Sequence, residues 1–235
     1  MKAFVSYLLQ WFKFKKLLRS SSGRFSLYWK DRYPCLNDNT ETTSFDRHYV
    51  YHQAWAARIL ASDKPEYHVD ISSMLFFCSL VSAFIPVKFF DYRPPDLVLD
   101  NLECEHADLL SLPFPDESIS SLSCMHVVEH VGLGRYGDPI DPDGDLKAMA
   151  ELKRVLAPGG NLFFVVPVGG VPKIMFNAHR IYSYQQVLDC FNGLELIEFA
   201  LVPDNAADGG LIKKATREMS DAQNYGCGCF LFIKR

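Results

Sequence analysis

The chain lacks an excess of charge of either sign, an internal repeat, and an N-terminal apolar segment long enough to span a membrane. Its 235 residues carry 24 Lys and Arg against 28 Asp and Glu, so the formal net charge is −4. This balance does not favour nucleic-acid binding, which needs a basic surface. A hydrophobic fraction of 49% is typical of a globular protein, and the length fits one α/β domain with extensions.

The cysteines do not form the pattern of a disulfide scaffold. All seven lie at irregular spacings, mostly in predicted strands and helices, and their number is odd. These features favour reduced thiols and a cytoplasmic location. Cys227 and Cys229 are separated by one residue, whereas zinc and redox pairs have two residues between the cysteines. We therefore predict no metal site from this pair.

The first 44 residues differ in composition from the rest of the chain. Residues 1–19 combine aromatic side chains with a cluster of Lys and Arg, as in a helix that lies at a membrane surface. They have neither the cleavage site of a signal peptide nor the length of a spanning helix. The alternative is that these aromatics pack on the domain or on a partner. Residues 20–44 read as an irregular linker, so we expect a globular domain over residues 45–235.

Strand and helix patterns alternate within this domain. Apolar runs typical of strands cover residues 67–72, 87–90, 97–106, 118–128, 161–167, 194–202 and 228–234. Helical spacing of apolar residues covers residues 45–61, 74–84, 146–156 and 184–191, with Ser183 placed to cap the last helix. Pro158, Gly159 and Gly160 are expected to end the third helix. The alternation predicts an α/β, Rossmann-like, doubly wound sheet of seven strands, mostly parallel with one antiparallel strand.

Polar residues follow three of the predicted strands. Asp91 comes after strand 87–90, Asp108 after strand 97–106, and Glu129 and His130 after strand 118–128. In open parallel sheets, ligands bind at the carboxyl ends of the strands. The sequence therefore predicts a small-molecule site at this edge.

Residues 108–167 resemble one known superfamily. They contain LPFPDESIS, a strand ending in His or Glu, a helix, RVLAPGG and a strand ending in Pro. In this order, the elements resemble the class I S-adenosylmethionine-dependent methyltransferases. The phrases HVVEHVGLGRYGDPIDPDGD and FNAHRIYS are similar to a bacterial methyltransferase-like family of unassigned function, often found among cell-envelope polysaccharide genes. The resemblance covers about residues 45–200 and implies S-adenosylmethionine as the cofactor.

The resemblance also implies which residues bind the cofactor. Asp91 would accept hydrogen bonds from both ribose hydroxyls in one bidentate contact. Asp108 would accept from the adenine amino group, while Leu109 offers its backbone amide. His126 would lie under the methionine part of the cofactor.

The first βα turn departs from the family pattern. Methyltransferases typically have several glycines there, which let the backbone approach the cofactor closely. This chain instead reads Asp70-Ile71-Ser72-Ser73-Met74. We expect Asp70, Ser72 and Ser73 to bind the cofactor through hydroxyl and amide groups, with Met74 crowding the approach.

Catalytic candidates cluster after the fourth strand. Transfer of a methyl group to oxygen needs a base within hydrogen-bond reach of the acceptor, and we expect His130 to be that base with Glu129 beside it. His179 falls where related methyltransferases place acceptor-side residues, and Arg180 could hold an anionic acceptor. The glycines between residues 132 and 137 are expected to shape a lid. The alternative is that the histidines only cap strands and bind backbone carbonyls.

A metal-assisted reaction is a further alternative. His126, Glu129 and His130 have the spacing of the Glu-x-x-Glu-His ligand set of some metal-dependent O-methyltransferases, with His179 as a possible fourth ligand. The acidic segment 138–145 lacks the Gly and the Glu that a calcium loop requires. Our prediction is a site without a resident metal ion.

The leading hypothesis is therefore a cytoplasmic S-adenosylmethionine-dependent methyltransferase. Its acceptor would be a hydroxyl of a sugar or a lipid-linked glycan in envelope polysaccharide biosynthesis, with residues 1–19 at the inner face of the membrane. The glycine-free turn raises a second hypothesis, a non-catalytic binding or scaffold protein with the same fold. No nucleic-acid partner is expected, and the sequence makes no prediction of the oligomeric state.

Overall fold

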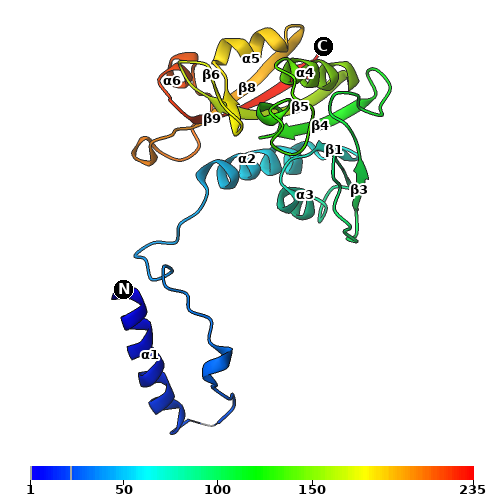
Figure 1. The fold of residues 1–235 in the computed structure, drawn as a ribbon. Coiled ribbons are helices and arrows are strands. Elements are labelled where there is room, and N and C mark those ends of the chain that lie inside the picture. The colour runs from blue at the N-terminus through cyan, green and yellow to red at the C-terminus, as the bar shows by residue number, and fades with distance from the viewer. Residues whose placement is uncertain (1, 22) are drawn as a thin grey trace. The chain divides into compact units, whose positions relative to one another are not determined.

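The computed structural model describes residues 2–21 and 23–235. Contacts between residues divide the chain into two units, residues 1–45 and residues 46–235. Figure 1 shows the elements of both units along the chain.

The first unit is built on helix α1 (Lys2–Leu18), followed by an irregular segment that contains the 3₁₀ turn η1 (Trp29–Asp31). Trp11 packs edge-on against Trp29, with ring centroids 5.1 Å apart. No residue of α1 is buried, and its large exposed apolar side chains are Phe4, Val5, Leu9, Phe12, Phe14 and Leu17. Within the part of the chain that the structure describes, no helix is both long and apolar enough to cross a lipid bilayer.

The second unit has a seven-stranded sheet at its centre, as predicted (Figure 1). Its strands are β1 (His68–Ile71), β2 (Val87–Asp91), β3 (Leu102–His106), β4 (Ile119–Met125), β5 (Leu156–Val168), β8 (Leu194–Val202) and β9 (Gly226–Lys234). Their order is β3-β2-β1-β4-β5-β9-β8. Strands β1 to β5 pair in parallel, while β9 is antiparallel to both of its neighbours.

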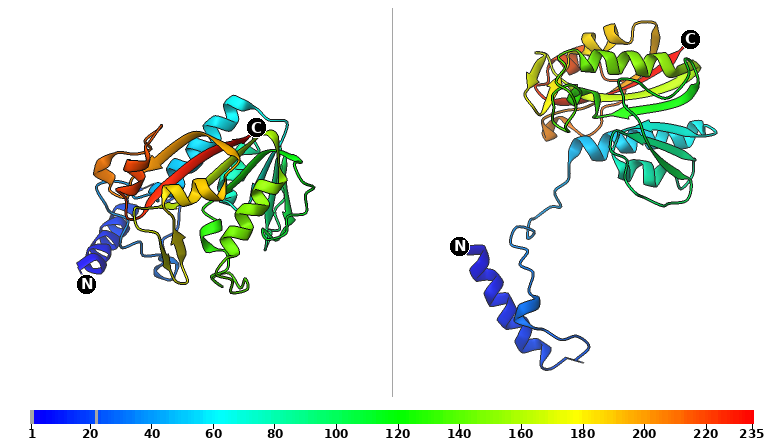
Figure 2. Two further views of the ribbon diagram at one scale, coloured as in Figure 1. Left: turned by 90° about the horizontal axis from the view of Figure 1, so that it is seen from above. Right: turned by 45° about the vertical axis from the view of Figure 1, so that its right-hand side comes forward.

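Helices cover both faces of this sheet, as Figure 2 shows from two sides. Helices α2 (Arg47–Asp63) and α3 (Leu75–Val81) contribute to one hydrophobic cluster, and α4 (Gly144–Val155) and α5 (Tyr184–Cys190) contribute to the other. Successive residues of β5 alternate between them, because strand side chains point to opposite faces. Phe164 packs with α4 and α5, and Phe163 packs with α2 and α3.

Shorter elements complete the second unit. They are η2 (Val128–His130), the hairpin β6 (Lys173–Met175) and β7 (His179–Ile181), η3 (Ala206–Asp208), and α6 (Arg217–Asp221). Ser183 caps α5 as predicted, through a capping box with Gln186.

The helix predicted over residues 146–156 is α4, but residues 158–160 do not end it as predicted. Helix α4 stops at Val155, and Leu156 already pairs with Ile119 as the first residue of β5. Residues 158–160 form an irregularity inside β5, where the register shifts between Ile119 and Ser121 of the partner strand. A side chain at Gly160 would bring its Cβ within 2.9 Å of the Ile119 carbonyl oxygen. Gly160 thus allows two strands to approach each other closely. It does not end a helix.

Candidate functional site

A cavity of about 350 Å³ lies at the carboxyl ends of β1, β2 and β4. Ser72 follows β1, Asp91 ends β2, and His126 follows β4. The remaining lining residues are Tyr92, Arg93, Asp108, Leu110, Val127, His130, Val131, Gly132, Tyr136, Asp138 and Pro139. Because parallel strands deliver their carboxyl ends to one edge of the sheet, residues far apart in the sequence meet in this cavity.

Asp70 and Ser73 do not line the cavity, which corrects the predicted contact between their side chains and a cofactor. Asp70 is buried, and its carboxylate accepts the backbone N–H of Ser73 at 3.0 Å and the hydroxyl of Ser123. The Ser73 hydroxyl accepts the backbone N–H of Met125 at 2.9 Å. Burial raises the pKa of Asp70 to about 6, against the opposing effect of these hydrogen bonds. Both side chains therefore join β1 to β4 behind the cavity wall.

Ser72 occupies the position at which a glycine would be expected. Its φ angle is +54°, in the left-handed region that side chains rarely adopt. Its hydroxyl donates to the Phe90 carbonyl at 3.3 Å. Met74 packs on the cluster beneath α3 and is not among the lining residues, so the predicted crowding is wrong. The turn thus takes a glycine-like conformation without a glycine.

Asp91 and Asp108 both line the cavity, and each uses one oxygen to hold its own turn. Asp91 Oδ1 accepts the backbone N–H of Arg93 at 2.7 Å, and Asp108 Oδ1 accepts that of Leu110 at 2.9 Å. The second carboxylate oxygen of each has no hydrogen-bond partner among the described residues. Leu109 has its side chain in the core, and its proposed backbone contact stays a prediction. The two carboxylates can therefore each accept a hydrogen bond from a ligand.

His126 and Glu129 form a buried pair at the end of β4. His126 is 8% exposed and Glu129 is 1% exposed. His126 Nδ1 lies 2.7 Å from Glu129 Oε1. A carboxylate only accepts hydrogen bonds, so Nδ1 carries a proton, and in the neutral imidazole Nε2 carries the lone pair. Among the described residues, neither His126 Nε2 nor Glu129 Oε2 has a hydrogen-bond partner.

His130 faces the cavity with a basic nitrogen. Its Nδ1 donates to the Ala178 carbonyl at 2.6 Å, which leaves Nε2 as the acceptor. Nε2 lies 3.8 Å from Glu129 Oε1. Burial lowers the pKa of His130, while the Glu129 carboxylate opposes this shift. His179 lies outside the cavity lining, stacked on Tyr225 at 4.9 Å, with its ring 6.4 Å from that of His130.

The loop between η2 and α4 borders the cavity and is held by two side chains. The Asp138 carboxylate accepts backbone N–H groups from Gly132 at 2.7 Å, Tyr136 at 3.2 Å and Gly134 at 3.3 Å. Burial favours a higher pKa for Asp138, but these N–H groups outweigh it and the pKa lies below its usual value. At Gly132, a Cβ would meet the Asp141 carbonyl oxygen at 2.0 Å. The loop is therefore a tightly hydrogen-bonded wall.

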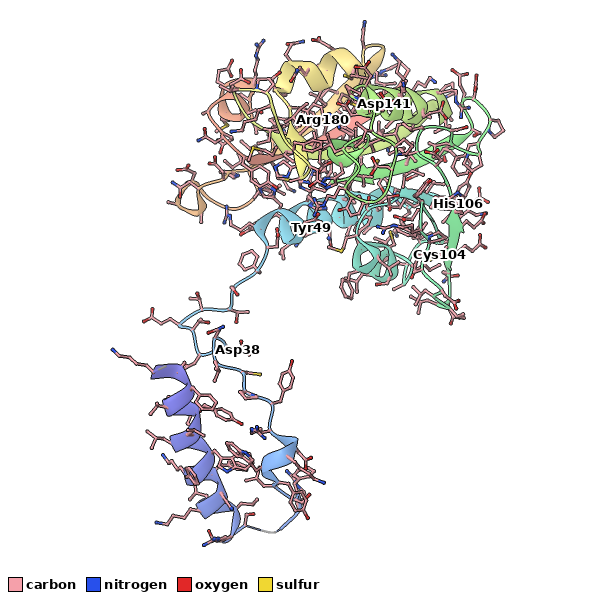
Figure 3. All side chains as sticks on the ribbon, in the orientation of Figure 1. Asp38, Tyr49, Cys104, His106, Asp141 and Arg180 are labelled. Atoms are coloured by element: carbon pink, nitrogen blue, oxygen red, sulfur yellow. The ribbon has the colours of Figure 1, made fainter. Side chains whose placement is uncertain are left out.

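Arg180 is the second residue that holds this loop. This differs from the prediction that Arg180 holds an anionic acceptor. Arg180 is buried and donates to the carbonyl oxygens of Val131 at 2.6 Å and Pro142 at 3.1 Å. Its Nε lies 3.5 Å from Asp145 Oδ1. Figure 3 shows Arg180 and Asp141 close to each other on this side of the unit. Asp143 occupies the N-cap position of α4 without a side-chain hydrogen bond.

The sequence analysis missed a cluster of rings behind His126. Its members are His48, Tyr49 and His52 of α2, His126, and Tyr225 just before β9, and the Cys227 sulfur lies close to His48 and His126. Figure 3 shows Tyr49 on the α2 side of the sheet. Burial, aided by Glu129, raises the pKa of Tyr49 to about 12. The i, i+4 spacing of His48 and His52 was a usable signal, but only the packing of α2 brings them to β4.

Tyr92, Arg93, Tyr136 and Asp138 were also missed as lining residues. Arg93 and Arg135 both lie over the Tyr136 ring, at 5.2 and 5.1 Å from its centroid. No local pattern distinguishes these positions from ordinary loop residues.

Comparison with known proteins identifies the fold. The N-methyltransferase NodS of Bradyrhizobium japonicum, in complex with S-adenosylhomocysteine, matches 84% of this chain and 93% of its own, with a TM-score of 0.54 and 13% identity. The 1,6-didemethyltoxoflavin N1-methyltransferase of Burkholderia thailandensis, with bound S-adenosylhomocysteine, matches 78% of this chain and 79% of its own, with a TM-score of 0.54 and 10% identity. The [4+2]-cyclase SpnF matches 77% of this chain and 81% of its own, with a TM-score of 0.50 and 14% identity.

These similarities show a class I methyltransferase fold, as predicted. A family model described as "Caenorhabditis protein of unknown function, DUF268" matches residues 116–221. No curated protein is significantly similar to the chain in sequence. The predicted link to polysaccharide genes stays a prediction.

Proposed function

We propose that this protein transfers a methyl group from S-adenosylmethionine to a hydroxyl group, with a sugar or a lipid-linked glycan as the acceptor. One observation carries the proposal. A single cavity brings together Asp91 and Asp108, each with an unengaged carboxylate oxygen, and His130, whose Nε2 can accept a proton. The two carboxylates can accept hydrogen bonds from the hydroxyl and amino groups of a nucleoside. His130 can accept the proton of a hydroxyl that receives the methyl group.

The donor groups of the cavity fit S-adenosylmethionine. A carboxylate such as Asp91 suits a ribose diol, because it can accept both hydroxyl hydrogens. Asp108 suits an exocyclic amino group, which is a hydrogen-bond donor. Ser72 already has the left-handed backbone that lets a chain pass close to a ligand. Ser72 therefore adds a side chain where related turns have glycine, while the backbone of the turn keeps the left-handed conformation.

The cofactor, when bound, supplies a methyl carbon attached to a positively charged sulfur. The protein's task is to position the acceptor oxygen and to take its proton as the new C–O bond forms and the C–S bond breaks. His130 Nε2 is the base that we assign to this proton. Glu129 Oε1, 3.8 Å away, stabilises the imidazolium that results, because an opposite charge at this distance favours the protonated form.

The acceptor side of the cavity favours a polyhydroxylated ligand. Arg93, Asp138 and Tyr136 line the cavity on the side of His130. A guanidinium donates hydrogen bonds, a carboxylate accepts them and a phenol does both, so this set can bind several hydroxyl groups. The envelope polysaccharide setting rests on sequence resemblance and stays a prediction.

Calorimetry with S-adenosylhomocysteine tests the binding step. We expect the full chain to bind it, and Asp91→Asn to weaken binding by about ten- to a hundredfold, because a charge-assisted hydrogen bond contributes about 1.5–3 kcal/mol. Asp96→Asn is the matched control, since Asp96 is exposed and outside the cavity lining. Absence of binding at millimolar ligand by folded protein would contradict the proposal and favour a scaffold role.

Transfer of a labelled methyl group tests the chemical step. The donor is S-adenosylmethionine carrying an isotopic methyl, and the acceptors are nucleotide sugars and lipid-linked sugars. His130→Gln should retain cofactor affinity and lose at least a hundredfold in rate, as expected for a general base. Because burial lowers the pKa of His130, the wild-type rate should be constant near neutral pH and fall in mild acid. A His130→Gln enzyme with an unchanged rate would show that another group takes the proton.

A further inference from the structure

Three potential metal ligands meet behind the cavity, from parts of the chain far apart in sequence. His48 lies in the first turn of α2, His126 directly follows β4, and Cys227 is the second residue of β9. One ligand atom from each lies within 4.8 Å of the other two. His126 and Cys227 are buried, and His48 is half-buried. We propose that His48, His126 and Cys227 bind one transition-metal ion, with Zn²⁺ as the ion that matches the donors best.

The protonation of His126 leaves a nitrogen suited to a metal. Glu129 Oε1 holds the proton on Nδ1 at 2.7 Å, so the lone pair is on Nε2. Among the described residues, nothing hydrogen-bonds to this buried Nε2. Leaving a buried acceptor unpaired is unfavourable, and a metal ion at this nitrogen would pair it. The observation points to a ligand that supplies positive charge.

Glu129 has the position of a supporting carboxylate. Metal-binding histidines usually donate their second ring N–H to a carboxylate or a carbonyl, which fixes the tautomer and makes the imidazole a stronger ligand. Glu129 does this for His126, and it is almost completely buried at 1% exposure. Its negative charge also offsets the charge of a divalent cation in a site with little water. A buried carboxylate whose Oε2 has no partner is otherwise costly.

The donor set selects the type of metal. Two imidazoles and one thiolate suit Zn²⁺ and other borderline-soft ions, whereas Mg²⁺ and Ca²⁺ prefer oxygen ligands. Bonds of about 2.0–2.3 Å place tetrahedral ligand atoms roughly 3.3–3.7 Å apart, so ligand atoms that lie within 4.8 Å of one another need to close by at most about 1.5 Å. His48 can make this adjustment because it is half-buried in the first turn of a helix. Three protein ligands leave a fourth position for water or for a substrate atom.

This site differs from the ligand set that the sequence suggested. His130 Nδ1 is committed to the Ala178 carbonyl, and the ring of His179 stacks on Tyr225. Among the described residues, the group of ligand atoms that all lie within 4.8 Å of one another contains neither of these histidines. The inference does not depend on methyl transfer, because it rests on the donors alone.

Metal content and visible absorption test the proposal on the full chain. After exposure to zinc and exhaustive dialysis, we expect about one zinc per chain by elemental analysis. Replacement by Co²⁺ should give a thiolate-to-cobalt charge-transfer band in the near ultraviolet, which requires a sulfur ligand. Cys227→Ser should remove this band, and both Cys227→Ser and His48→Gln should weaken zinc binding at least a hundredfold. Glu129→Gln should weaken it about ten- to a hundredfold, as supporting residues do.

Cys229→Ser is the matched control. Cys229 is buried on the same strand with its sulfur 3.9 Å from that of Cys227, yet it is not part of the group, so this variant should keep both the metal and the band. Near-ultraviolet circular dichroism without metal verifies that each variant is folded. Wild-type protein without stoichiometric zinc would overturn the proposal. So would metal that survives Cys227→Ser and His48→Gln but is lost in His130→Gln, which would place it on the other ligand set.

Discussion

Asp70 shows how one buried carboxylate can make stability depend on pH. It is fully buried between β1 and β4, where it accepts from Ser123 and from the backbone of Ser73. Ser123 also contacts His68 Nε2 at 2.8 Å, so the three side chains form one network. Burial outweighs the hydrogen bonds and raises the pKa of Asp70 to about 6. Ionising Asp70 in the folded protein is therefore unfavourable.

This raised pKa predicts a loss of stability with rising pH. A carboxyl that binds its proton more tightly when folded contributes stability that is fully present below about pH 4 and is lost as pH rises to about 6. A shift of this size corresponds to about 2–3 kcal/mol. In Asp70→Asn this dependence should disappear, which urea unfolding across the pH range would measure. Asp96→Asn, at an exposed site, should keep it, and an Asp70→Asn variant with the wild-type pH profile would contradict the prediction.

Ser72 and His126 share an unusual backbone conformation. Both have positive φ angles, +54° and +58°, although neither is glycine. Both directly follow a strand that ends at the cavity, β1 and β4. Left-handed backbone costs a side chain about 1–2 kcal/mol, and such strain concentrates where a ligand is bound. Lys64, Asn101, Glu117 and Lys214 also have positive φ angles, but Ser72 and His126 are the two of these six residues that line the cavity.

At the scale of elements, the loop between η2 and α4 depends on one residue of β7. Arg180 donates to three loop carbonyls and lies beside Asp145 of α4. The same Asp145 accepts the Tyr182 hydroxyl at 2.8 Å. Through these contacts β7, α4 and the loop form one wall of the cavity.

Removing the Arg180 contacts should release this wall. In Arg180→Met, three carbonyls lose a charged donor and Asp145 is left buried with less compensation, so we expect a loss of about 3 kcal/mol in the free energy of unfolding. Limited proteolysis should cut within residues 131–143 faster than in the wild type. Lys173→Met, at an exposed position of β6 in the same hairpin, is the control. Equal cleavage rates in the two variants would show that Asp138 holds the loop without Arg180.

At the scale of the whole molecule, the chain consists of two units with different surfaces. Residues 46–235 contain both hydrophobic clusters. In residues 1–45, α1 carries exposed aromatic and aliphatic side chains and has Lys15 and Lys16 in its last turn. A helix with this combination binds at lipid surfaces, where each Lys or Arg contributes about 1 kcal/mol at an anionic membrane.

We expect the full chain to sediment with vesicles that contain anionic lipid, and less so with neutral vesicles or at high salt. A chain without residues 1–20 should lose this binding and unfold at the same temperature, because no residue of α1 is buried. Phe12→Ser, which alters one exposed aromatic, should weaken sedimentation without affecting unfolding. Equal sedimentation of full and shortened chains would instead favour packing of α1 on a protein partner.

The fold class, the seven strands and the single antiparallel strand could be predicted from the sequence alone. These follow from local periodicity and from the alternation of strands with helices, which each segment carries in its own residues. The sequence also placed Asp91, Asp108 and His130 at one sheet edge, because the ends of parallel strands converge; His126 was expected at the site only through the family resemblance. The glycine-free turn could not be interpreted from sequence, since the φ angle of Ser72 is imposed by its neighbours.

Which of these residues face the cavity and which face the core depends on long-range packing. Asp70 and Ser73 point behind the wall, and Arg180 holds a loop instead of an acceptor. His48, His126 and Cys227 are separated by more than seventy residues at each step, and no spacing rule links them. They meet because α2 packs across the end of β4 and β9 inserts antiparallel beside β5. Such a site depends on long-range packing, which a single sequence does not encode as a local pattern.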